Sequence, residues 1–67
     1  MEEIINELVE TCRRMSEGMR AHISDDDLLI DLRAQLDAIL GAKNEALPME
    51  VYTFVVMRAL RVLKEDL

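Results

Sequence analysis

The sequence predicts a small all-α domain built from three helices. Apolar residues recur every three or four positions along three separate segments, which is the period of one face of an α-helix. The 51% of residues that are apolar are almost all aliphatic or sulfur-containing, because only Tyr52 and Phe54 are aromatic. With 67 residues, the chain is long enough for one small core, so we expect a single domain over 1–67.

The first helix is expected at about residues 2–21. One face of this segment carries apolar residues at intervals of 3, 4, 3 and 4: Ile5, Leu8, Cys12, Met15 and Met19. Charged residues lie on the other faces, and Glu10 precedes Arg14 in the favourable i to i+4 order. This pattern is typical of an amphipathic helix with one buried face.

The second helix is expected at about residues 25–40. Ser24 is a favoured N-cap residue, and Asp27 follows three positions later, where a capping box expects an acid. Asp25 and Asp26 then lie in the first turn, where the helix dipole favours anions. Gly41 is the expected residue after the helix, although the good helix formers that follow it also allow the helix to continue to residue 45.

The third helix is expected at about residues 48–66, because Pro48 suits a first turn and an apolar period continues to the end of the chain. Residues 51–57 are β-branched and aromatic enough to suit a strand as well, which leaves their secondary structure open. Helix is favoured since no second strand is available as a partner. We expect the first two helices to form an antiparallel pair and the third to pack across them.

The acidic cluster Asp25 to Asp27 next to His22 raises the question of a metal or ligand site. Consecutive residues on a helix point about 100° apart and do not converge on one ion, so helix capping is the preferred interpretation. A regulatory module that binds a small ligand or metal through these residues is the second hypothesis. No cofactor is expected. The single cysteine, Cys12, excludes an internal disulfide and is interpreted as a core residue.

A second apolar face on the third helix indicates an interface. Val51, Val55 and Val62 lie about 100° to 140° from the expected core face, with Phe54 further round, and Ile30 is isolated among charges on the second helix. We therefore expect these five residues to form contacts in a homodimer. The alternative is that the third helix is central and is covered on two sides by the other two.

The function expected from these features is protein–protein interaction without catalysis, by a small acidic adaptor, inhibitor or chaperone-like subunit. Arg58, Arg61 and Lys64 complement the dipole of the third helix and are candidate contacts to a charged partner. DNA binding is the third hypothesis, and the formal charge of −6 argues against any nucleic-acid partner. No membrane contact is expected, and the acidic start of the chain indicates a cytoplasmic protein.

Overall fold

The structure of the protein is a computed structural model that describes residues 2–14 and 24–65. These residues form three α-helices, which are α1 (Glu2–Arg14), α3 (Asp25–Lys43) and α4 (Met49–Glu65). None of the described residues lies in a β-strand. The predicted all-α, three-helix class is confirmed, and the ambiguous segment 51–57 is helical.

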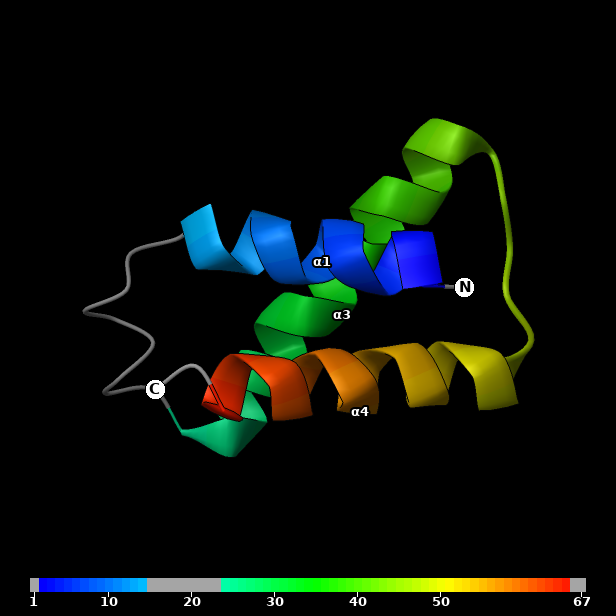
Figure 1. The fold of residues 1–67 in the computed structure, drawn as a ribbon. Coiled ribbons are helices and arrows are strands. Elements are labelled where there is room, and N and C mark those ends of the chain that lie inside the picture. Colours follow the sequence, from blue (N-terminus) through cyan, green and yellow to red (C-terminus); the bar gives the residue numbers. More distant parts are fainter. Residues whose placement is uncertain (1, 15–23, 66–67) are drawn as a thin grey trace.

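Each helix packs against the other two (Figure 1). α1 and α4 lie side by side and run in the same direction, whereas α3 runs back in the opposite sense and crosses both obliquely. α3 crosses the other two helices, and α4 packs against both α1 and α3 as predicted. The reason is that α4 buries apolar residues on two sides, so that it packs beside α1 as well as against α3.

α1 follows the predicted apolar face over the part that the structure describes. Ile5, Leu8, Val9 and Cys12 are buried in the core. Glu2 and Glu3 lie in the first turn and Arg13 and Arg14 in the last, an arrangement that complements the helix dipole at both ends. The predicted continuation to residue 21 lies outside the described residues.

α3 begins at the predicted N-cap. Ser24 has an extended backbone, and its Oγ accepts a hydrogen bond from the backbone N–H of Asp27 at 3.2 Å. This bond satisfies one of the N–H groups that a helix start leaves without an intrahelical partner. Leu28, Leu32, Leu36, Ile39 and Leu40 then enter the core.

α3 ends three residues later than predicted, at Lys43. Asn44 is the residue in the left-handed region, with φ 54°, and its N–H donates to the carbonyl of Gly41 at 3.2 Å. The N–H of Glu45 donates to the carbonyl of Leu40 at 3.0 Å, which completes a Schellman motif. The prediction of Gly41 as the terminating residue is wrong, because Asn also tolerates this conformation and the residues between them are good helix formers.

α4 supplies Val55, Val56, Ala59, Leu60 and Leu63 to the core. Val55 has no exposed surface, so its predicted place on an exposed second face is wrong. Val51 and Val62 are partly buried and pack against the same core. The alternative interpretation of the valines therefore holds, because this side of α4 is covered within the monomer.

Polar contacts also connect the helices at the surface. The Tyr52 hydroxyl of α4 donates to Asp37 Oδ1 of α3 at 2.9 Å, and Lys64 Nζ lies 2.8 Å from Asp25 Oδ2 at the other end of the same pair of helices. Lys43 of α3 lies 3.3 Å from Glu7 of α1. Within the described ranges, no helix is both long enough and apolar enough to cross a membrane.

Candidate functional site

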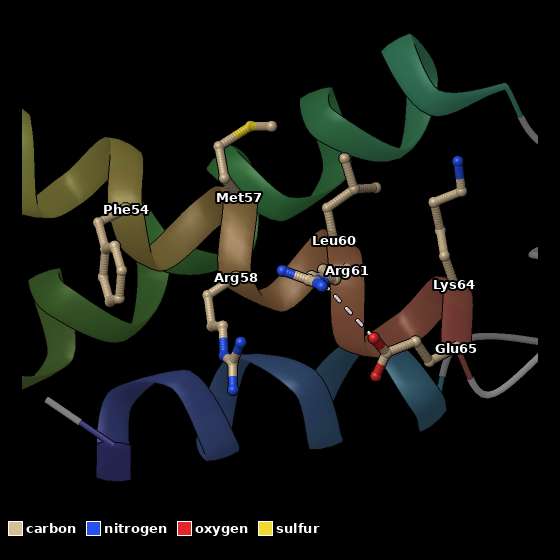
Figure 2. Close-up of a pocket in the computed structure, with 7 residues that line it drawn as sticks. All are labelled: Phe54, Met57, Arg58, Leu60, Arg61, Lys64 and Glu65. Atoms are coloured by element: carbon tan, nitrogen blue, oxygen red, sulfur yellow. Dashed lines mark ion pairs between the residues drawn. The ribbon is translucent and has the colours of Figure 1, made fainter.

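The exposed side of α4, between the edges that adjoin α1 and α3, is the strongest candidate for a contact surface. We call this the outer face, defined by Glu50 together with Phe54, Met57, Arg58 and Arg61, and Figure 2 labels the last four of these residues. Phe54 is 55% exposed and Met57 is 50% exposed. Single exposed apolar residues are ordinary on a protein surface, but these two large ones are three residues apart on one helix and line the same hollow.

A surface hollow of about 640 Å³ runs along this helix. Figure 2 shows that Met57 points towards α3, that Arg58 points towards α1 and that Phe54 lies further along the helix. The floor includes Leu60, which is 93% buried. The lining thus runs from apolar residues near the start of α4 to mostly charged residues near its end, and comprises Phe54, Met57, Arg58, Leu60, Arg61, Lys64 and Glu65.

The three cations of the lining differ in how strongly they are held. Lys64 is paired with Asp25 on α3, and Arg61 Nε lies 3.5 Å from Glu65 Oε1 on the same helix (Figure 2). Both groups of the second pair are about two-thirds exposed, so the pair is weak. Arg58 makes no hydrogen bond or ion pair with any residue in 2–14 or 24–65. Its guanidinium is thus available to an external group.

A second hollow, of about 520 Å³, lies where α4 begins against α3. Its polar centre is Tyr52, whose hydroxyl oxygen lies 2.9 Å from Asp37 Oδ1 and 3.3 Å from the Arg33 carbonyl oxygen. Burial, followed by the hydrogen bond to Asp37 and the charge of Asp37, raises the pKa of Tyr52 above its ordinary value. These contacts fix α4 against α3. The lining of the hollow contains one further hydroxyl, that of Thr53.

The residues predicted as an interface do not lie together. Phe54, Arg58, Arg61 and Lys64 share one hollow, as expected for a partner-binding surface. Ile30 is 63% exposed, but it lies on α3 and lines neither of the hollows described above. Val62 lies beside Ile5, Asn6 and Phe54 between α1 and α4, which shows that the valine side of α4 faces α1.

Met57 belongs to the candidate surface and was not predicted. Its position three residues after Phe54 places it on the same face of the helix, and this spacing was available in the sequence. Met57 was overlooked because the predicted interface was centred on the valines. The candidate surface is centred about 100° or more further round the helix.

The acidic residues at the start of α3 contact other parts of the described chain. Among residues 2–14 and 24–65, no group of three or more His, Cys, Asp or Glu side chains is arranged to hold a metal ion. Asp25 instead pairs with Lys64, and Asp27 provides the N–H that Ser24 caps. His22, the other half of the predicted ligand site, lies outside the described residues.

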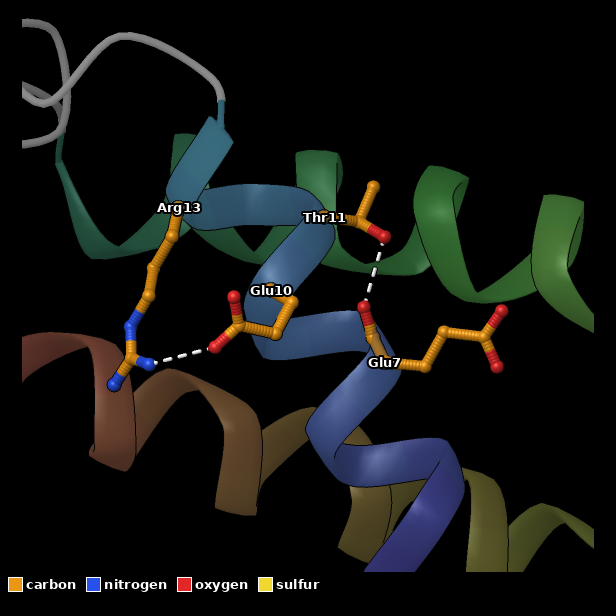
Figure 3. Close-up of polar contacts among 4 residues, drawn as sticks. All are labelled: Glu7, Glu10, Thr11 and Arg13. Atoms are coloured by element: carbon orange, nitrogen blue, oxygen red, sulfur yellow. Dashed lines mark hydrogen bonds and ion pairs between the residues drawn. The ribbon is translucent and has the colours of Figure 1, made fainter.

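The polar side chains of α1 interact mainly with their own helix (Figure 3). Thr11 Oγ1 donates to the carbonyl of Glu7 at 2.8 Å, and Arg13 Nη1 lies 2.9 Å from Glu10 Oε1. Contacts at spacings of three and four residues are the ordinary interactions of a solvated helix surface. We assign no binding role to this group of residues.

Comparison of the chain with protein-family models, with curated proteins and with solved structures found no match. The function is therefore argued from the residues of the outer face and from the core that positions them.

Proposed function

We propose that this chain is a non-catalytic protein–protein interaction module, and that its contact surface is the outer face of α4. The observation that carries the proposal is the exposure of Phe54 and Met57 in one hollow, next to an arginine without a partner among the described residues. Phe, Met and Arg are the residue types that are enriched where protein interfaces are most fully buried. In the monomer all three are in contact with water.

The physical reason is the free energy gained when these side chains are transferred from water into a contact with a partner. Burial of apolar area stabilises a complex by roughly 25 cal/mol per Å², and a phenylalanine that is half exposed still has a large area to bury. The guanidinium of Arg58 can accept a planar acidic group at the edge of the same contact. The outer face thus combines an apolar centre with a directional polar margin.

The broader expectations from the sequence are part of this proposal. A small acidic adaptor, inhibitor or chaperone-like subunit that forms a homodimer is consistent with a contact surface on α4. The proposed contact is now centred on Phe54 and Met57, because Val55 is fully buried. The absence of catalysis and the cytoplasmic location stay predictions.

Site-specific photo-crosslinking tests the proposed surface. A benzophenone amino acid is placed at position 54 and, as a matched control, at position 3, which is also exposed but lies on α1. Both variants are expressed in the natural host and irradiated. We expect crosslinked products at position 54, either with the chain itself or with another protein, and none of the same products at position 3.

The proposal fails if position 54 gives no products, or gives the same products as position 3. In that case the exposed apolar pair would be a solvated surface feature without a partner. The masses of the products at position 54 also separate self-association from binding to a different protein.

A further inference from the structure

We propose that the occupant of the outer face is a second copy of this chain, with the two α4 helices packed antiparallel about a two-fold axis. This inference rests on the proposed function, and it adds the partner and the pairing of residues. The basis is the order of side chains along the outer face, which is an acid, two apolar residues and a cation: Glu50, Phe54, Met57 and Arg61.

The spacing of these residues suits helix packing. They follow one another at intervals of 4, 3 and 4, which is the spacing of the contact positions in a pair of helices that pack at a shallow angle. In an antiparallel pair, each contact residue lies opposite a contact residue of the partner, and residue numbers rise along one helix while they fall along the other. When Phe54 is opposite the partner's Met57, the next layer outward on that side places Glu50 opposite the partner's Arg61, and the two-fold axis repeats this pair at the other end.

The apolar centre of this arrangement contains two copies of the same contact. Phe54 packs against the partner's Met57, and Met57 packs against the partner's Phe54. Contacts between a thioether and an aromatic ring are favourable, and both side chains are about half exposed in the monomer. The two-fold axis passes between these layers, as expected for an interface formed by the same surface on both copies.

Charge complementarity selects the antiparallel direction. Glu50 lies in the first turn of α4 and Arg61 lies three turns later, so reversal of one helix brings opposite charges together at both ends of the apolar centre. A parallel pair would instead place Glu50 against the partner's Glu50 and Arg61 against the partner's Arg61. The exposed pair of Arg61 with Glu65, at 3.5 Å, is weak enough to be exchanged for the new contact.

One pair of helices is a small interface. Stable complexes usually bury about 1,600 Å² in total, and smaller contacts are typical of weak or transient association. We therefore expect a reversible dimer that is populated in the micromolar range or above. Its mass should be twice the 7.7 kDa of one chain.

A charge-swap experiment tests both the partner and the direction. Self-association of the wild type, Glu50→Arg and Arg61→Glu is measured by sedimentation equilibrium over a range of concentrations. Each single variant places two pairs of like charges in its own dimer, so we expect association to weaken about tenfold or more. An equimolar mixture of the two variants restores both opposite-charge pairs, and we expect it to associate as the wild type does.

Glu45→Arg is the matched control, because it makes the same charge change at an exposed position outside α4. It should dimerise like the wild type. Circular dichroism reports whether each variant is folded. If a single variant unfolds, the double variant Glu50→Arg with Arg61→Glu is measured as well. It restores opposite-charge pairs in its own dimer, so we expect it to self-associate as the wild type does.

The inference is overturned if the wild type is monomeric at concentrations up to about 1 mM. It is also overturned if the two single variants do not recover when mixed. A crosslink from position 54 to a different protein, together with a monomeric wild type, would leave the proposed function intact and refute the second copy as the occupant.

Discussion

Tyr52 connects two helices through a single side chain. Its hydroxyl proton is directed to acceptors on α3, which are the Asp37 carboxylate at 2.9 Å and the Arg33 carbonyl oxygen at 3.3 Å. Ionisation of the phenol would remove this proton and place a second negative charge beside Asp37. The fold therefore favours the neutral phenol, and the pKa of Tyr52 is raised.

The raised pKa can be measured directly, because Tyr52 is the only tyrosine and the chain has no tryptophan. An absorbance titration of the phenolate should give a pKa above the ordinary 10.0. Asp37→Asn should lower that pKa towards 10.0 without reaching it, since burial of the phenol is retained. Asp31→Asn is the control, because it makes the same change elsewhere on α3.

The same shift has a consequence for stability. The folded pKa lies above the unfolded value, so above pH 10 the unfolded chain loses the phenolic proton more readily than the folded chain. The contribution of Tyr52 is therefore fully present below pH 10 and is lost as the pH rises through the folded pKa. A wild-type pKa at 10.0 would show that in solution the phenol is neither buried nor in contact with Asp37.

At the scale of the element, the two ends of α3 were predicted with different success. The N-cap Ser24 could be predicted because serine is a favoured residue directly before a helix start rich in aspartate. In the structure its hydroxyl accepts the hydrogen bond from the Asp27 N–H. The other end was placed at Gly41, because glycine is the commonest residue after a helix. The structure instead uses Asn44, and a Cβ added at Gly41 would meet no atom within 4 Å. A side chain at position 41 would therefore be accommodated.

Removal of the cap should weaken α3 in a measurable way. Ser24→Ala deletes the acceptor of the Asp27 N–H, and we expect the free energy of unfolding to fall by about 1 kcal/mol in urea denaturation. Ser24→Thr keeps a hydroxyl and is the matched control. Divalent metal ions should have no effect on either variant. Unchanged stability accompanied by loss of a metal response would instead favour the ligand-binding hypothesis for the acidic cluster.

At the scale of the whole molecule, the sequence specified three helices and most of the core but not which sides of α4 are covered. The core positions of α1 and α3 follow single apolar faces, so they could be read from the spacing alone. α4 is apolar around more than half of its circumference, and periodicity does not show which neighbour covers which side. Val55 was consequently assigned to the surface, and the candidate surface was centred away from Met57.

A pair of substitutions to aspartate separates the core from the surface of α4. Val55→Asp introduces a carboxylate at a fully buried position, and we expect a loss of several kcal/mol, enough to unfold a domain of this size. Phe54→Asp, at the neighbouring exposed position, should stay folded and lose self-association. Circular dichroism with sedimentation gives both readouts. A folded, monomeric Val55→Asp would show that the valines form the contact surface after all.

The contacts at the two ends of α4 also determine its rotation about its own axis. Tyr52 is held to Asp37 near one end of the helix, and Lys64 is held to Asp25 near the other. A roll of α4 that brought Phe54 towards the core would have to break both contacts and turn fully buried residues such as Leu63 out into water. Among the described residues, α4 therefore cannot turn its outer face inward without exposing core residues, so Phe54 and Met57 are kept in contact with water.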